Sequence, residues 1–176
     1  YYDTTLQVSE RWFSLAIFDA NKGQAEAALI AEEAGIGLDL AGKPVDAQVV
    51  EAVKEVERRT GGRVKYHGEL FGTKETFMRR AKGMFYWPSY KEGFGEAHSH
   101  KLVEALMMGV PCVVRDQGAM REVFGGFAAK CPQKAINMLR AAPSLQRGAI
   151  ALRAAQRWAV PNVARRILSE VERCKQ

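Results

Sequence analysis

Residues 84–114 read MFYWPSYKEGFGEAHSHKLVEALMMGVPCVV, in which two apolar runs flank a glycine-rich loop and an amphipathic segment. The first run, residues 84–87, is short and stops at Pro88, as a buried strand does. Residues 100–108 place apolar side chains at helical spacing, and Gly109 is suited to the C-terminus of that helix. Residues 111–114 form the second run. The stretch therefore predicts a strand, a loop, a helix and a second strand, the unit from which parallel sheets are built.

The rest of the chain continues this alternation. Four more apolar runs have the length of buried strands: residues 12–18, 38–41, 63–67 and 127–130. Segments with helical features separate them: residues 24–34, a helix that Asp46 is placed to cap, a helix that Thr73 precedes, and residues 120–124. Because the runs lack the alternation of half-exposed strands, they predict an α/β fold, a Rossmann-like parallel sheet flanked by helices.

The length of 176 residues suits one domain with extensions. Residues 1–11 show no clear period and are interpreted as a linker or arm. Residues 12–131 form the predicted Rossmann-like domain. Residues 132–176 have only helical patterns, and we expect a helical C-terminal extension that packs on the domain.

Positive charge is concentrated in that extension. Nine of the 26 Lys and Arg residues, but only two of the 20 acids, lie from Lys134 onward. This basic tail is consistent with a solvated helix face, a phosphate-rich ligand, peripheral contact with an anionic membrane, or nucleic acid. Phe85, Tyr86 and Trp87 are interpreted as core residues rather than as a platform on which bases stack, and so are Trp12 and Trp158, so we expect no nucleic-acid partner.

The sequence contains no apolar run long enough to span a bilayer and no basic-then-apolar signal pattern. Its three cysteines, Cys112, Cys131 and Cys174, are odd in number and far apart, which fits neither a disulfide framework nor a clustered metal site. We therefore expect a cytoplasmic protein, with membrane association through the basic tail as an open alternative.

In open α/β sheets, ligands bind at the carboxyl ends of the strands, on the loops that lead into helices. Three such loops stand out, at residues 19–23, 89–99 and 115–119. Glycines in these loops let backbone N–H groups approach a phosphate closely, and a following helix presents its positive N-terminal end. Carboxylates accept paired hydrogen bonds from the vicinal hydroxyls of a sugar. Such loops are typical of a nucleotide-sugar site.

The motifs between Pro88 and Glu122 resemble the donor-binding, C-terminal domain of GT-B glycosyltransferases, specifically retaining family 4, the glycosyl transferases of group 1. The matching features are a strand that ends in Pro88-Ser89, the sequence Glu-Gly-Phe-Gly, a helix that carries Glu104-Ala105, and Gly109-Val110-Pro111 before the next strand. The resemblance covers residues 12–124 in the same order of strands and helices.

The resemblance implies site residues. The family has two glutamates eight positions apart, one near the hexose and one at the ribose, and Glu96 and Glu104 have this spacing. Glu92 is twelve positions from Glu104, and which of Glu92 and Glu96 is the sugar-side carboxylate stays open. Glu96 and Lys22 are the predicted catalytic residues, Lys22 at the diphosphate. The remaining predicted donor contacts are Gly23, Glu92, Gly93, Phe94, Gly95, Leu102, Val103 and Glu104.

The chain departs from the family pattern at one position. Where the family has an arginine about five residues before Lys22, this sequence has Ile17 and Phe18. Stabilisation of the leaving group would then rest on Lys22, on helix dipoles and on either Lys101 or Arg115.

No metal or other cofactor is expected. His98 and His100 are the nearest candidates for a metal pair, but no carboxylate or cysteine completes a set at typical zinc spacing. His67, at the end of a predicted strand, is interpreted as structural or as lining a pocket.

The resemblance implies transfer of a sugar, a hexose, from a nucleoside-diphosphate sugar to the hydroxyl of an unknown acceptor. A GT-B enzyme has two Rossmann-like domains, so the N-terminal, acceptor-binding domain would be the missing partner. Two alternatives remain: a GT-B-like half of a sugar-nucleotide epimerase, and a non-catalytic α/β module whose basic tail binds a membrane or nucleic acid. Product analysis would separate the first alternative from transfer, and salt-dependent binding of the tail alone would favour the second.

Overall fold

The computed structural model describes residues 7–90, 99–124, 127–141 and 146–173. Its centre is a six-stranded sheet in the order β3-β2-β1-β4-β5-β6, with every pair parallel. The strands are β1 (Trp12–Leu15), β2 (Leu38–Ala41), β3 (Val64–Tyr66), β4 (Met84–Tyr86), β5 (Cys112–Arg115) and β6 (Ala128–Ala129). This confirms the predicted Rossmann-like α/β fold.

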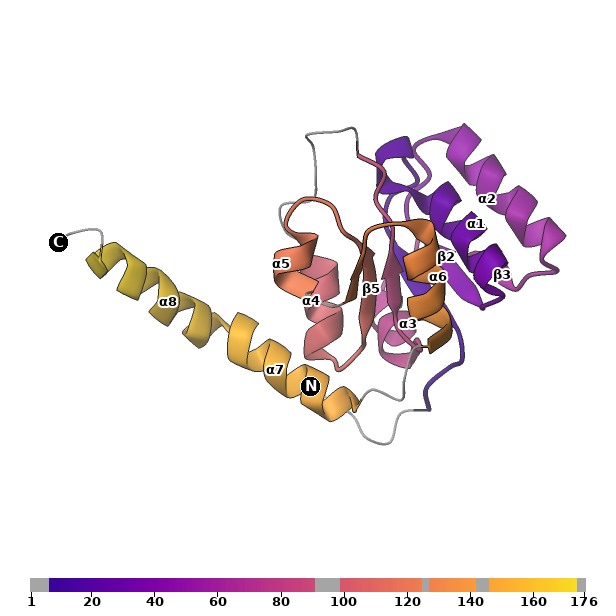
Figure 1. Ribbon diagram of the computed structural model, residues 1–176. Helices are drawn as coiled ribbons and strands as arrows, with labels where there is room; N and C mark the ends of the chain where they lie inside the picture. The colour runs from indigo at the N-terminus through magenta and orange to yellow at the C-terminus, as the bar shows by residue number, and fades with distance from the viewer. Residues whose placement is uncertain (1–6, 91–98, 125–126, 142–145, 174–176) are drawn as a thin grey trace.

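Helices cover both faces of the sheet (Figure 1). They are η1 (Ala20–Lys22), α1 (Gln24–Ala34), α2 (Ala47–Arg59), α3 (Lys74–Arg80), α4 (His100–Met107), α5 (Met120–Phe124), α6 (Pro132–Ala141), α7 (Arg147–Trp158) and α8 (Val160–Arg173). One core joins the sheet to α1, α2 and α6, and a second joins its other face to α3, α4 and α5. Every strand except β3 contributes side chains to both cores, which explains why these strands read as continuous apolar runs, whereas β3 contributes only to the first core.

Local signals fix most element boundaries. Asp46 caps α2 as predicted, with its Oδ1 accepting from the N–H groups of Gln48 and Val49 at 2.8 and 3.4 Å. Thr73 precedes α3, but its side chain makes no capping hydrogen bond. The first strand is shorter than predicted and ends at Leu15, because the chain then leaves the ladder and returns only as an isolated bridge between Phe18 and Pro44.

The C-terminal helices differ in how they attach. Arg140 of α6 donates to the carbonyl oxygens of Glu33 and Ala34 at the end of α1. Arg147 of α7 donates to the carbonyl oxygens of Arg79 and Ala81 at 2.9 and 2.6 Å. α8 projects away from the sheet beyond α7 (Figure 1), and its apolar residues Ile167 and Leu168 are exposed.

The N-terminal segment is attached through the residues before β1. The N–H of Ser9 donates to the Arg80 carbonyl oxygen at 2.7 Å, and Lys82 pairs with Glu10 at 2.9 Å. Cys112 is a buried free thiol whose pKa is raised by burial, and Cys131 is an exposed free thiol. No described helix is long and apolar enough to cross a membrane.

Candidate functional site

The strand order has its topological switch point between β1 and β4. These neighbouring strands continue into helices on opposite faces of the sheet, β1 into α1 and β4 into α4. Ligands of doubly wound sheets bind in the crevice at this point, beyond the carboxyl ends of the strands. A ligand is therefore expected to meet the loops that follow β1 and β4.

Gly23 joins the two loops in close contact. It has a left-handed backbone, with φ of 63°, and a Cβ added here would lie 1.8 Å from the carbonyl oxygen of Trp87. The N–H of Ser89 donates to the Asn21 carbonyl oxygen at 2.9 Å. Only glycine allows this approach, because any other side chain would collide with the backbone after β4.

Lys22 directs its cation toward the loop after β4. Its Nζ donates to the hydroxyl of Tyr90 and lies 4.9 Å from the centre of that ring. The carbonyl oxygen of Tyr90 accepts from Gln117 Nε2 at 2.8 Å. Residues from the loops after β1, β4 and β5 therefore meet around Tyr90, which sequence reasoning had not singled out.

Arg115 supplies a second cation at this edge of the sheet. Its Nη1 donates to the Pro88 carbonyl oxygen at 3.0 Å and to Ser89 Oγ at 3.1 Å. The guanidinium carbon lies 5.4 Å from the centre of the Trp87 ring. Arg115 thus holds the chain immediately after β4, whereas Lys101, the other candidate, lies with its Nζ 4.1 Å from the centre of the Tyr86 ring.

Helix α4 begins beside these loops. Ser99, at its N-cap, is 3% exposed, and its Oγ has no hydrogen-bond partner among the described residues. A buried hydroxyl at the positive end of a helix, beside a glycine-rich loop, is suited to an anionic ligand.

The predicted contacts on α4 take different positions. The side chains of Leu102 and Val103 are buried in the core, and their N–H groups donate to the Ser99 carbonyl oxygen at 3.1 and 3.2 Å. Glu104 lies one turn into the helix with an exposed side chain, so its carboxylate is available to a ligand. The helix turns its neighbours Leu102, Val103 and Ala105 inward and Glu104 outward.

The glycine-rich loop falls outside the described residues. This applies to Glu92, Gly93, Phe94, Gly95, Glu96 and His98. The choice between Glu92 and Glu96 therefore stays a prediction. Among the residues that the structure describes, no three His, Cys, Asp or Glu side chains are grouped as metal ligands.

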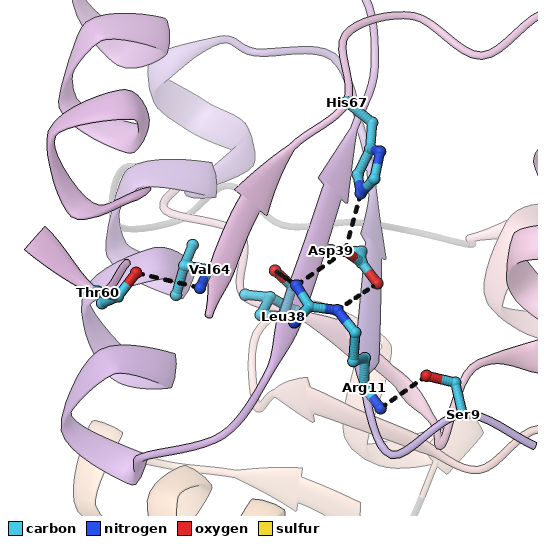
Figure 2. Close-up of polar contacts among 7 residues, drawn as sticks. All are labelled: Ser9, Arg11, Leu38, Asp39, Thr60, Val64 and His67. Carbon is cyan, nitrogen blue, oxygen red and sulfur yellow. Dashed lines mark hydrogen bonds and ion pairs between the residues drawn. The ribbon is translucent and has the colours of Figure 1, made fainter. Parts of the chain in front are cut away.

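A second polar cluster lies on β2 and includes His67 (Figure 2). The carboxylate of Asp39 accepts from Arg11 Nε and Nη2, both at 2.9 Å, and contacts His67 Nε2 at 2.8 Å. Burial acts to raise the pKa of Asp39, but the hydrogen bonds from Arg11 and His67 outweigh it and hold the pKa below its ordinary value. This cluster ties the segment before β1 to the sheet, so His67 has a structural role there.

Comparison with known proteins identifies a family and solved structures with the same fold. A sequence model of the family "Glycosyl transferases group 1" matches residues 24–142. Among curated protein sequences, none matches this chain significantly.

Solved glycosyltransferase structures share the fold. AviGT4, a glycosyltransferase involved in avilamycin A biosynthesis, superposes with a TM-score of 0.77 at 21% identity, over 98% of this chain and 54% of its own. Anabaena HepE, in complex with UDP and glucose, gives a TM-score of 0.70 at 21% identity, over 93% and 48%. TarM of S. aureus gives 0.71 at 11% identity, over 96% and 36%.

The chain therefore spans about half or less of each of these structures, 54%, 48% and 36% of their lengths, and corresponds to one Rossmann-like half of a GT-B protein. The family match covers more than half of the chain. The protein belongs to the group 1 glycosyltransferases.

Proposed function

We propose that this chain is the donor-binding domain of a retaining glycosyltransferase that transfers a hexose from a nucleoside-diphosphate sugar to an acceptor hydroxyl. The observation that carries the proposal is the convergence at the switch point. Lys22, the closely packed Gly23 and the start of α4 all lie where the loops after β1 and β4 meet. A cation, a tight backbone approach and a positive helix end together suit a diphosphate.

The diphosphate is the leaving group of the transfer, so its charge is what the site stabilises. Lys22 lies in the connection after β1, and helix α4 begins in the connection after β4. Fixed positive groups aimed at developing negative charge lower the barrier without a metal ion. Arg115 supports this arrangement by holding Pro88 and Ser89 in place.

The sugar and ribose are assigned to carboxylates. Glu104 is exposed on the first turns of α4, and it would accept the ribose hydroxyls. Glu96, with Glu92 as its alternative, is proposed to contact the hexose. The HepE structure holds UDP and glucose, and the TarM structure holds UDP, which supports UDP as the first nucleotide to test.

The acceptor is proposed to bind a second, N-terminal domain across the crevice. Its support is that this chain spans only 54% of AviGT4 and 48% of HepE. We also propose a cytoplasmic location, supported by the free thiols of Cys112 and Cys131.

Substitution of Glu104 by glutamine is expected to weaken binding of a UDP-sugar by roughly tenfold to a hundredfold, because the neutral amide loses charge-assisted hydrogen bonds worth about 1.5–3 kcal/mol. Isothermal titration calorimetry measures the change. Glu33→Gln is the matched control, since Glu33 is exposed on α1 and loses the same charge. Equal affinities for the two variants would remove Glu104 from the proposed site.

A further inference from the structure

A small apolar pocket lies at the edge of the sheet opposite the candidate donor site. It has a volume of about 200 Å³ and is bounded by the end of α4, the start of β5, α5 and α7. Phe124, Phe127, Ile150 and Trp158 supply apolar walls, and Arg153 and Arg157 of α7 also line it. Pro111 and Cys112, at the amino end of β5, also lie in its wall. Lys22 and Arg115 lie at the opposite, carboxyl end of the strands, so the pocket is separate from the candidate donor site.

The two arginines lack carboxylate partners among the described residues. Arg157 Nη2 donates to the Glu122 carbonyl oxygen at 3.2 Å, and its guanidinium carbon lies 4.9 Å from the centre of the Trp158 ring. The ion pairs of the described part of the chain include neither Arg153 nor Arg157. An apolar pocket with two uncompensated cations is complementary to an anionic amphiphile.

The sequence around the pocket is also basic and partly apolar. Between Glu122 and Glu170 there is no acid, and the segment contains eight Lys or Arg residues: Lys130, Lys134, Arg140, Arg147, Arg153, Arg157, Arg165 and Arg166. Phe127 in the pocket wall is 39% exposed, and two further apolar side chains of the C-terminal helices, Leu152 of α7 and Val160 of α8, are 61% and 80% exposed. Exposed apolar groups beside arginines and a tryptophan are features of surfaces that lie on membranes.

The tail helix is a weaker candidate for the same role. On α8, Arg173 pairs with Glu170, and Arg165 donates to Asn162 Oδ1. The Arg173 cation is thus neutralised by a carboxylate, whereas neither Arg153 nor Arg157 has a carboxylate partner among the described residues.

We propose that the α7 pocket binds an anionic phospholipid, with an acyl chain against Phe127 and Trp158 and the phosphate at Arg153 and Arg157. A volume of about 200 Å³ is below the roughly 300–1,000 Å³ of pockets that enclose a whole ligand, which suits the end of one inserted chain. Because the pocket lies away from the donor loops, the inference does not depend on the proposed glycosyl transfer.

Vesicle sedimentation tests the proposal with the chain itself. We expect binding to mixed phosphatidylcholine and phosphatidylglycerol vesicles and little binding to phosphatidylcholine alone. The double variant Arg153→Gln/Arg157→Gln should lose roughly tenfold to thirtyfold in partitioning, since each cation near such a surface contributes about fivefold and the two contributions multiply. Arg165→Gln/Arg173→Gln removes the same charge from α8 and should lose less than about threefold. Equal losses of partitioning in the two double variants would show non-specific attraction and contradict the proposed lipid site. Equal binding of the wild type to neutral and anionic vesicles would also contradict it.

Fluorescence locates the acyl chain. Trp12 and Trp87 are 1% and 2% exposed, so quenching by phosphatidylglycerol with brominated acyl chains reports on Trp158. We expect quenching that Trp158→Phe removes, in variants whose thermal unfolding matches the wild type. Vesicle binding without quenching, or quenching equally strong in Trp158→Phe, would contradict the proposal. Binding of an acidic peptide without any vesicle binding would point to a protein partner and overturn it.

Discussion

Replacing Gly23 by alanine is expected to lower the midpoint of thermal unfolding by about 10 °C and to abolish binding of a nucleotide sugar. The left-handed backbone costs alanine about 1–2 kcal/mol, and the overlap of its Cβ with the Trp87 carbonyl oxygen adds about 1–3 kcal/mol. In a domain of this size, 1 kcal/mol changes the midpoint by about 2–4 °C. The collision also separates the loops after β1 and β4, between which the donor is proposed to bind.

Gly35→Ala is the matched control for this effect. Gly35 has a similar φ of 71°, but a Cβ there would meet nothing within 4 Å. We expect it to lower the midpoint by only about 3–6 °C and to leave donor affinity unchanged, because only the backbone term applies. Differential scanning calorimetry measures both variants. If Gly23→Ala is no less stable than Gly35→Ala, the close packing of the two loops is wrong.

Asp39→Asn is expected to lower the free energy of unfolding by about 2 kcal/mol at neutral pH. The Asp39 side chain is 15% exposed, and the substitution removes an ion pair with Arg11 and weakens the contact with His67. Loss of one member of a buried pair costs about 3–5 kcal/mol, and the 32% exposure of Arg11 reduces that figure through solvent screening.

The direction of the pH dependence follows from the lowered pKa of Asp39. A carboxyl whose pKa is lower in the folded than in the unfolded protein stabilises the fold above its unfolded pKa, about 4. That contribution is lost as the pH falls through the folded pKa. The difference between wild type and Asp39→Asn should therefore be full at about pH 7 and shrink below about pH 4 in urea unfolding.

Asp46→Asn provides the control for this substitution. Asp46 caps α2 through Oδ1, and asparagine caps helices equally well, so we expect a change below about 0.5 kcal/mol. If the effect of Asp39→Asn were the same at about pH 7 and about pH 2.5, the carboxylate would not be the stabilising group.

Much of the fold could be predicted because its signals are local. The boundaries of α1 and β2 match the predicted residues 24–34 and 38–41. Gly23 precedes α1 and Gly35 ends it, and both have left-handed backbones. The alternation of buried runs with helical segments was sufficient for the parallel sheet. The largest difference was at the end of a strand, at Leu15, where tertiary pairing decides how far a ladder extends.

The site was less predictable because its contacts join distant parts of the chain. Arg115 was one of two alternatives for a supporting cation, and only the structure shows that it bonds Pro88 and Ser89. The pairing of Arg11 with Asp39 spans 28 positions, and neither residue belongs to a motif. The buried hydroxyl of Ser99 reads in sequence as an ordinary helix cap, so no local pattern marked it.

The central claim is that this domain binds a nucleotide sugar at the β1–β4 switch point. Calorimetric titration with UDP-, GDP- and ADP-glucose tests it most directly, on the wild type, Lys22→Gln and the control Lys54→Gln, which removes an exposed charge from α2. We expect at least one donor, UDP-glucose first, to bind, with affinity reduced roughly tenfold to a hundredfold in Lys22→Gln and unchanged in Lys54→Gln. Absence of binding to all three donors, or equal affinities for the two variants, would contradict the account.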